Sequence, residues 1–255
     1  MRWHFLQTPP ADGAHNMALD EALMRRAGRS GQAVFRVYGW SVPTLSLGRN
    51  QRSRDCYDED AANRLGVAFV RRPTGGRALL HHREVTYSAT LPVEDAGAAG
   101  AAYAFINAVL LRALGAMGVP AALPTHPASI PPGLRPCFDV PAEHEIAVDN
   151  RKLVGSAQWR SQGTLLQHGS ILVRDDQPLI GQLLRSQVAH TPRAATLSDA
   201  LGYDPSADDV ARQILQSLEE ATESPAVPLV VDDRLRSDAE RLCETYRDPS
   251  WTWRR

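Results

Sequence analysis

The feature that constrains the fold most is a run of three predicted strands near the middle of the chain. These strands are expected over residues 145–148, 152–158 and 164–173. An Asp149-Asn150 pair suits the tight turn between the first two. Strands joined by such short turns pair antiparallel, so the three segments are expected in one sheet. The second strand begins at Lys152, the only lysine among 28 basic residues.

The rest of the chain predicts a mixture of strands and helices. Further strands are expected over residues 3–7, 34–38, 44–47, 67–71 and 84–91, and helices over 16–26, 100–118, 207–221 and 234–246. Gly28 and Gly31 are expected to end the first helix. The stretch Gly39–Pro43 predicts the turn of a hairpin between the strands on either side of it. The Pro-rich stretch Pro120–Pro136 suits neither regular structure, and Cys137 follows it.

Composition excludes several classes of protein. A chain of 255 residues is long enough for one large domain, and 43% hydrophobic against 22% charged residues argues against disorder. The formal net charge of -1 gives no positive field, so no nucleic-acid partner is expected. The N-terminus lacks the apolar region of a signal peptide, and no stretch approaches the roughly 18 apolar residues of a membrane span. No membrane partner is therefore expected.

The cysteines favour a cytoplasmic protein with free thiols. They lie at positions 56, 137 and 243, an odd number without a C-x-x-C motif, which fits neither a disulfide framework nor structural zinc. We therefore expect a soluble, cytoplasmic protein. Cys56 and Cys243 are interpreted as small hydrophobic residues without a role in catalysis.

Lys152 and Cys137 form the candidate catalytic pair. Arginine supplies almost every positive charge in this chain, so a retained lysine needs a chemical reason. An ammonium can lose its proton when it is desolvated and fits as a compact charge beside a nucleophile, whereas a guanidinium stays protonated. Raising the thiolate fraction of Cys137 is such a role. An exposed lysine without a role is the alternative.

A glycine pair, Gly75-Gly76, lies between two predicted strands. Tandem glycines let the backbone approach a ligand closely, and successive amides can then point at a carbonyl or an anion. Arg71, Arg72 and Arg77 bracket the pair, and His81 follows on the returning strand. A tight turn with a rim of solvated arginines is the alternative.

Small and hydrogen-bonding residues occupy two adjacent predicted strands. Gly155-Ser156-Ala157-Gln158 lies on one strand and Gln167–Ser170 on the next. Small residues there leave room for a chain-like ligand, although they also permit close strand packing. A metal site of His81, His82 and His168 is disfavoured because no ligand spacing or carboxylate partner is apparent.

Several of these segments carry a family resemblance. Residues 71–81, R-R-P-T-G-G-R-A-L-L-H, resemble the R-R-x-[ST]-G-G-[GR]-A-[VL]-x-H signature of the lipoate-protein ligase and octanoyltransferase superfamily, which is related to biotin-protein ligases. Residues 152–158 and 165–172 are similar to its K-[ILV]-x-G-S-A-Q and L-x-[HQ]-H-G-[ST]-[IL]-L blocks. Residues 16–23 and 38–48 also match, so the resemblance covers most of the chain.

Two features within the superfamily point to the LipM-type octanoyltransferases. Arg77 stands where ligases commonly have a third glycine, and Cys137-Phe138-Asp139 precedes the lysine block. His82 and Arg49-Asn50 depart from the family pattern and leave the acyl-chain or carrier preference open.

The resemblance implies an α/β fold. A mixed, largely antiparallel sheet is flanked by helices and accompanied by a smaller sheet, as in the biotin/lipoate-protein ligase catalytic domain. It also implies one catalytic domain over residues 1–255, with the catalytic region at about 30–222 and a helical extension at 223–255.

The activity implied is transfer of octanoate from octanoyl-acyl carrier protein to a lysine of a lipoyl-domain protein. The acceptor is a glycine-cleavage H protein or a dehydrogenase E2 subunit. A Cys137 acyl-thioester carries the chain between the two proteins, and neither ATP nor a cofactor is required. Three alternatives stay open: an ATP-dependent lipoate-protein ligase, an octanoyl amidotransferase between lipoyl domains, and a non-catalytic carrier-binding relative.

The resemblance also implies a set of site residues. Cys137 and Lys152 are the catalytic residues. The substrate-binding residues are Arg72, Thr74, Gly75, Gly76, Arg77, Ala78, His81, Gly155, Ser156, Ala157, Gln158, His168 and Gly169. Of these, Gly75, Gly76, Ala78, His81 and Ala157 are expected around a slot for the octanoyl chain. Backbone amides near Gly155 and Ser156, or Lys152 itself, are expected to stabilise the oxyanion, and no metal ligand is expected.

Cys137→Ala is expected to abolish turnover and to remove any octanoyl adduct of the enzyme, because the variant lacks the nucleophile. Intact mass and steady-state rate measure the two effects. Cys56→Ala and Cys243→Ala are the matched controls and should keep both the adduct and the rate. An unchanged rate in Cys137→Ala would exclude the covalent mechanism.

Overall fold

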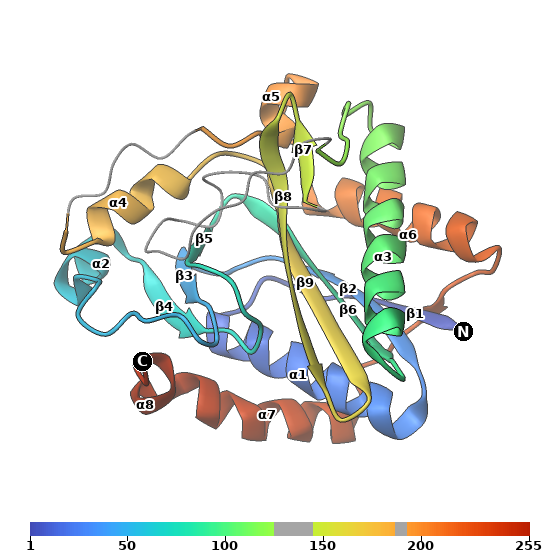
Figure 1. The fold of residues 1–255 in the computed structure, drawn as a ribbon, viewed down its shortest axis with the longest axis horizontal. Coiled ribbons are helices and arrows are strands. Elements are labelled where there is room, and N and C mark those ends of the chain that lie inside the picture. The colour runs from blue at the N-terminus through green and yellow to red at the C-terminus, as the bar shows by residue number, and fades with distance from the viewer. Residues whose placement is uncertain (125–144, 187–192) are drawn as a thin grey trace.

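The computed structural model describes residues 1–124, 145–186 and 193–255, which form two sheets surrounded by helices (Figure 1). The strands are β1 Trp3–Gln7, β2 Ala33–Tyr38, β3 Thr44–Leu47, β4 Ala68–Arg71, β5 Leu79–His81, β6 Glu84–Pro92, β7 Ile146–Val148, β8 Arg151–Ser161, β9 Thr164–Leu172 and β10 Val227–Pro228. The helices are α1 Gly13–Ser30, α2 Glu59–Leu65, α3 Ala96–Ala116, α4 Ile180–Leu183 after a 3-10 turn at Gln177–Leu179, α5 Leu197–Leu201, α6 Ala207–Thr222, α7 Asp233–Arg247 and α8 Pro249–Thr252.

The described residues form a seven-stranded sheet in the order β10-β1-β2-β6-β9-β8-β7 and a three-stranded sheet in the order β4-β3-β5. β1 runs parallel to both of its neighbours, whereas the remaining pairs of the larger sheet are antiparallel. The predicted fold class is therefore confirmed, as are the three antiparallel strands β7, β8 and β9. In register, His168 on β9 lies opposite Ser88 on β6 and Ala157 on β8.

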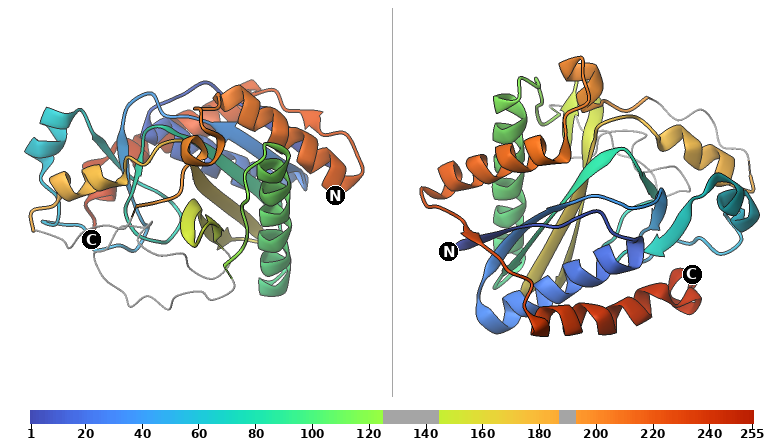
Figure 2. Two further views of the ribbon diagram at one scale, coloured as in Figure 1. Left: turned by 90° about the horizontal axis from the view of Figure 1, so that it is seen from above. Right: turned by 180° about the vertical axis from the view of Figure 1, so that it is seen from behind.

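Two pairs of helices cover the two faces of the larger sheet. α1 and α7 pack together on one face, and α3 and α6 pack together on the other (Figures 1 and 2). The core beneath α3 and α6 includes Phe35 and Tyr87, whose stacked rings lie 5.7 Å apart. The core beneath α1 and α7 includes Tyr38 and Tyr246. Apolar burial on both faces thus holds the sheet between two helical layers.

Local sequence signals explain the limits of α1. Asp12 Oδ1 accepts a hydrogen bond from His15 N at 2.7 Å, so the helix begins at Gly13, earlier than predicted. Gly31 ends the helix with a left-handed φ of 70°. Gly28, which was also expected at the end, lies inside the helix because strong helix formers precede it.

The predicted hairpin between residues 34–38 and 44–47 is wrong. β2 and β3 belong to different sheets. Both edges of β2 are occupied, by β1 and β6, so β3 pairs instead with β4 and β5. The Gly39–Pro43 connection therefore carries the chain from one sheet to the other, and Trp40 lies on it.

The C-terminal part of the chain contains a strand that the sequence did not predict. β10 pairs parallel with β1 through His4 opposite Val227, and α7 packs on α1. Residues from the predicted extension thus join the main sheet and its helical layer. The organisation as one catalytic domain stays a prediction, which these contacts support.

α3 corrects the expectation about membrane spans. This helix of 21 residues is long and apolar enough to cross a membrane by length and composition alone, because its many alanines raise its hydropathy without large side chains. In the fold, Ile106, Val109 and Leu110 are fully buried in the core. The core helix of a globular protein meets the same criteria, so one such helix is weak evidence for a membrane.

A buried ion pair joins α1 to the sheet. Arg36 Nη1 on β2 donates to Asp20 Oδ1 on α1 at 2.7 Å, and neither side chain is exposed. Asp20 also accepts hydrogen bonds from Tyr38 Oη at 2.8 Å and Ser88 Oγ at 2.7 Å. Burial raises the pKa of Asp20, but the charge of Arg36 and the hydrogen bonds from His168 and Ser88 outweigh it, so the pKa lies below its ordinary value of 3.8.

Asp20→Asn is expected to lower the free energy of unfolding by about 3–5 kcal/mol, because it leaves the buried charge of Arg36 without its partner. Urea denaturation measures the loss. Because the folded-state pKa of Asp20 is lowered, the stability contributed by its carboxylate is present above pH 3.8 and is lost as the pH falls through the folded-state value.

The control for this prediction is Asp233→Asn, which removes a fully exposed carboxylate paired with Arg236. Its effect should be small because exposed pairs contribute little. Equal stability of the Asp20→Asn and Asp233→Asn proteins would contradict the role given to the buried pair.

Candidate functional site

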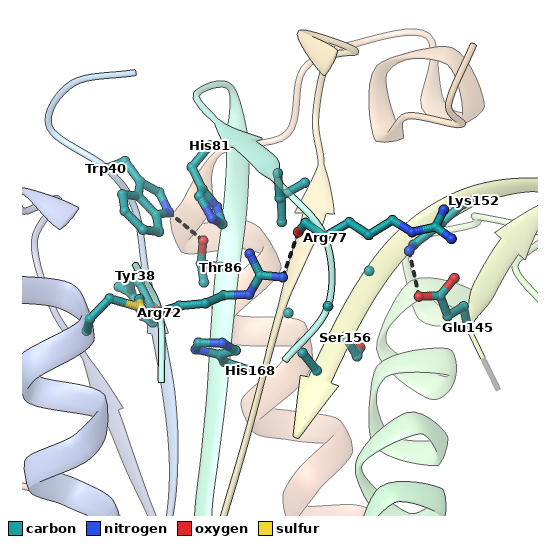
Figure 3. Close-up of a pocket in the computed structure, with 16 residues that line it drawn as sticks. Tyr38, Trp40, Arg72, Arg77, His81, Thr86, Glu145, Lys152, Ser156 and His168 are labelled. Atoms are coloured by element: carbon teal, nitrogen blue, oxygen red, sulfur yellow. Dashed lines mark hydrogen bonds and ion pairs between the residues drawn. The ribbon is translucent and has the colours of Figure 1, made fainter. Parts of the chain in front are cut away.

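A cavity of about 280 Å³ lies where the two sheets meet (Figure 3). Its walls come from α1, β2, β5, β6, β8 and β9, and from the glycine loop, which we define as residues 72–77 between β4 and β5. The lining is mostly apolar, with a few polar groups. A small cavity of this kind suits a narrow apolar ligand that reacts at one end.

Lys152 lines one side of the cavity and is almost completely buried. Its Nζ donates to Glu145 Oε1 at 2.5 Å, and only 1% of its side-chain surface is exposed. Figure 3 shows this pair on the opposite side of the cavity from Trp40 and Tyr38. A charge-assisted hydrogen bond at a buried position holds the ammonium in one place. The predicted partner of Lys152, Cys137, lies outside the described residues.

Arg72 shapes the glycine loop from within. Its Nη2 donates to the carbonyl oxygens of Gly75 at 2.8 Å and Arg77 at 2.7 Å. Gly76 has a φ of 92°, and a Cβ there would lie 2.7 Å from Arg72 Nη2. A Cβ on Gly48 would lie only 1.9 Å from Gly76 O. Both positions therefore require glycine, and the loop is held rigidly against its neighbours.

His168 is the middle member of a buried hydrogen-bonded chain. Its Nδ1 lies 3.1 Å from Asp20 Oδ2, and its Nε2 lies 2.6 Å from Thr74 Oγ1. Burial lowers the pKa of His168 below its usual value, although Asp20 acts in the opposite direction. The neutral ring therefore donates a hydrogen bond from Nδ1 to the ionised carboxylate and accepts one from the Thr74 hydroxyl at Nε2. This chain fixes the glycine loop to β9 and α1.

His81 is fixed on the cavity wall by three neighbours. Its Nδ1 lies 2.7 Å from Glu84 Oε1, its Nε2 lies 2.8 Å from Ser46 Oγ, and the Trp40 ring stacks on it at 3.9 Å. Trp40 Nε1 donates to Thr86 Oγ1 at 2.7 Å, and Thr86 Oγ1 donates to Glu84 Oε1 at 2.5 Å. These bonds join the small sheet to the large one at the cavity.

Ser156 belongs to a second polar network, which extends away from the cavity. Its Oγ lies 2.7 Å from Tyr87 Oη, which accepts a hydrogen bond from Gln167 Nε2 at 3.0 Å. Gln158 Nε2 in turn donates to Gln167 Oε1 at 3.0 Å. Burial raises the pKa of Tyr87 well above its usual value, so the phenol stays neutral. Gln158 thus links β8 to β9 through its hydrogen bond to Gln167.

The structure brings most of the described, predicted site residues to one cavity. Those that line it are Arg72, Gly76, Arg77, His81, Lys152, Gly155, Ser156, Ala157, His168 and Gly169. Thr74, Gly75, Ala78 and Gln158 lie outside the lining. Thr74 and Ala78 are buried, the Thr74 hydroxyl is bound to His168, and the carbonyl of Gly75 is bound to Arg72. For these four, a supporting role fits the structure better than contact with substrate.

Sequence reasoning missed several lining residues. They are Met17, Tyr38, Trp40, Leu79, Thr86 and Glu145. Glu145 had a usable signal, because the predicted pairing of the strands around the Asp149-Asn150 turn brings residues near 145 beside Lys152. The apolar residues had none, since only the tertiary fold separates those that face a cavity from those that face the core.

Each of the two cavity histidines has a carboxylate partner that the sequence did not reveal, Glu84 for His81 and Asp20 for His168. Within residues 1–124, 145–186 and 193–255, no group of three or more His, Cys, Asp or Glu side chains is arranged to hold a metal ion.

Comparison with known proteins identifies the family. The model of the lipoyl protein ligase A/B catalytic domain matches residues 12–219. The chain belongs to this family. Its relatives include an octanoyltransferase LipM of Kyrpidia tusciae, 36% identical over 271 residues that cover 99% of both proteins. Octanoyltransferases LipM of Exiguobacterium sibiricum and Staphylococcus aureus are 33% and 31% identical, and each alignment covers 99% of both proteins.

Solved structures of lipoate protein ligases share the fold. A putative lipoate protein ligase from T. acidophilum with bound lipoic acid superposes with a TM-score of 0.82 at 22% identity, covering 99% of this chain and 100% of the other. A lipoate-protein ligase A bound with ATP also reaches 0.82, at 21% identity, over 99% of both chains. At this level of identity the likeness shows the fold.

Lys152→Arg is expected to leave the protein folded but to lower kcat at least about 100-fold. A guanidinium is larger than an ammonium and cannot give up its proton, and the site around Nζ is closed. Steady-state kinetics and a melting curve measure the two properties. Arg151→Lys, at the neighbouring and more exposed position, is the control and should keep its rate. A fully active Lys152→Arg enzyme would show that any cation serves there.

Proposed function

We propose that the chain is an octanoyltransferase of lipoate biosynthesis. It moves an octanoyl group from octanoyl-acyl carrier protein to a lysine of a lipoyl-domain protein, with glycine-cleavage H protein or a dehydrogenase E2 subunit as the acceptor. The observation that carries the proposal is the mostly apolar cavity with the buried Lys152–Glu145 pair on one side. Its LipM relatives, aligned over almost the whole chain, support the same activity.

The proposed reaction proceeds through an acyl-enzyme. The thiolate of Cys137 attacks the carbonyl carbon of the octanoyl thioester, a new C–S bond forms, and the old C–S bond breaks. The leaving thiolate of the carrier takes up a proton. The amine of the acceptor lysine then attacks the acyl-enzyme, which forms an amide, releases the sulfur of Cys137 and gives up a proton. Exchange of a thioester for an amide is downhill, so this route uses no ATP.

Lys152 is assigned two tasks in this reaction. Its ammonium favours the thiolate form of the nucleophile in the first step, because an adjacent positive charge stabilises the anion. In the second step its nitrogen lies within the cavity, where it can exchange a proton with the reacting groups. The hydrogen bond to Glu145 supports this assignment because it holds the nitrogen at one place on the cavity wall.

An unpaired stretch at the edge of β8 supports the proposal that backbone amides of this strand stabilise the oxyanion. β7 pairs with β8 only as far as Val154, so in the described chain the edge from Gly155 onward has no strand partner on that side. Backbone amides at such an edge are available as donors, as the developing negative charge requires. Amides of consecutive residues point to opposite edges of a strand, so whichever of Gly155 and Ser156 faces the open edge is assigned to the oxyanion site. The apolar wall near Ala157 and His81 is assigned to the octanoyl chain.

Location in the cytoplasm is part of the proposal. Its support is that the two cysteines in the described part of the chain, Cys56 and Cys243, are both free thiols.

The deciding experiment incubates the protein with octanoyl-acyl carrier protein, without ATP, and follows the intact mass. An octanoyl adduct on the wild-type enzyme is expected, and it should be discharged when a lipoyl-domain protein is added. Octanoylated acceptor must accumulate as the enzyme adduct is discharged. If transfer instead requires free octanoate or lipoate together with ATP, with release of pyrophosphate, the enzyme is a ligase and the proposal fails.

A further inference from the structure

A second hollow, of about 750 Å³, opens between α1, α7 and the turn of the β8–β9 hairpin. We call it the arginine–tryptophan groove, after the lining residues Arg25, Arg29, Arg49, Trp159 and Trp251. None of these residues takes part in the reaction proposed above. Arginine and tryptophan are the side chains most often used as anchors in protein interfaces, so a partner protein is a natural occupant.

Arg49 is the central cation of the groove. Its guanidinium lies over the ring of Trp159 at 4.8 Å and 5.9 Å from the ring of Trp251. Arg254 stacks on the ring of Trp251 at 3.8 Å and donates to Arg49 O at 2.6 Å. The two guanidinium groups are thus held in place by aromatic rings rather than by carboxylates.

Positive charge around Arg49 is poorly compensated. Within the described residues no Asp or Glu pairs with Arg49, Arg71 or Arg254, and Arg254 Nε is buried without a hydrogen-bond partner. Burial and the charges of Arg254 and Arg255 lower the pKa of Arg71 to about 10. Glu21 also lines the groove, where it pairs with Arg25 and accepts a hydrogen bond from Tyr246. Arg29 pairs with Asp238, so among the described residues Arg49 is the lining arginine without a carboxylate partner. An external anion would relieve this repulsion.

We infer that the arginine–tryptophan groove is the docking surface for the acidic face of the carrier protein that donates the octanoyl group. This inference rests on the proposed function. A carboxylate on the carrier would pair with Arg49, while Arg25 and Arg29 at the rim keep Glu21 and Asp238 as partners. The carrier's apolar contacts would cover the two indole rings. Charge complementarity of this kind accelerates encounter and fixes orientation.

The distance from the groove to Lys152 favours the donor over the acceptor. Trp159 lies seven residues beyond Lys152 on β8, which corresponds to about 23 Å along a strand. A lysine side chain of an acceptor is far too short to bridge that distance, whereas a carrier protein presents its thioester on a long, flexible arm. Gly155 and Ala157, which line the cavity, alternate in phase with Trp159, so small residues lie on the face of β8 between the groove and Lys152.

The test measures donor and acceptor kinetics of Arg49→Glu in the full-length enzyme. The donor KM should rise at least about tenfold, while kcat and the acceptor KM change less than about twofold. Arg160→Glu is the matched control, because Arg160 is exposed and adjacent on β8 but alternates to the other face of the strand. It should keep the wild-type donor KM. Added salt should raise the donor KM of the wild type more than that of Arg49→Glu.

A protein-free donor, octanoyl-pantetheine, separates docking from chemistry. Wild type, Arg49→Glu and Arg160→Glu should all use it at similar rates, which also shows that the variants are folded. Equal donor KM values for Arg49→Glu and Arg160→Glu, a rise in the acceptor KM instead, or loss of the pantetheine reaction in Arg49→Glu would each overturn the inference. If the wild type itself leaves octanoyl-carrier protein unconsumed, the proposed function fails and the docking inference falls with it.

Discussion

The carboxylate of Asp20 is the interaction on which the rest of the structure depends most. It lies where α1 crosses β2, β6 and β9, and it binds Arg36, Tyr38, Ser88 and His168 at once. A buried carboxylate is stable only when its charge and lone pairs are satisfied, so each of these partners is needed in its place. The packing of the helix and the orientation of one cavity histidine therefore have a common cause.

The position of the glycine loop depends on the hydrogen bonds around Asp20. The neutral ring of His168 binds Thr74, and Arg72 holds the carbonyl groups of the same loop from within. Glu84 fixes His81, the other lining histidine of the described chain, in a similar way. A cavity wall in which each polar group already has a partner is rigid, and a rigid wall is what positioning of an acyl chain requires.

Sequence patterns predicted the parts of the fold that local signals determine. The turn at Asp149-Asn150 and the alternation on either side of it gave the three strands around Lys152 correctly. The same kind of reasoning failed at Gly39–Pro43, because a turn signal does not tell whether the next strand returns to the same sheet. It also missed β10, whose two residues form a strand only because the edge of β1 is available.

The site was predictable where function requires rare residues. The glycine pair, the lone lysine and His168 attracted attention because their types are chemically unusual in those positions. Glu145 and Trp40 did not, since an acidic residue before a strand and an aromatic residue in a turn are common. Their place at the cavity depends on pairing between β7 and β8 and on the crossing between the two sheets.

The close contact at Gly169 limits how this cavity can be redesigned. A Cβ there would lie 2.6 Å from both Gly155 O and Tyr87 Cε1, so main chain forms this stretch of wall and no side chain can be introduced to reshape it. Directed evolution toward longer or shorter acyl groups thus has to act on lining side chains outside the buried polar networks, such as Met17 and Leu79. A combinatorial library restricted to those positions would vary the range of acyl groups accepted. It would exclude Gly169, where only glycine fits.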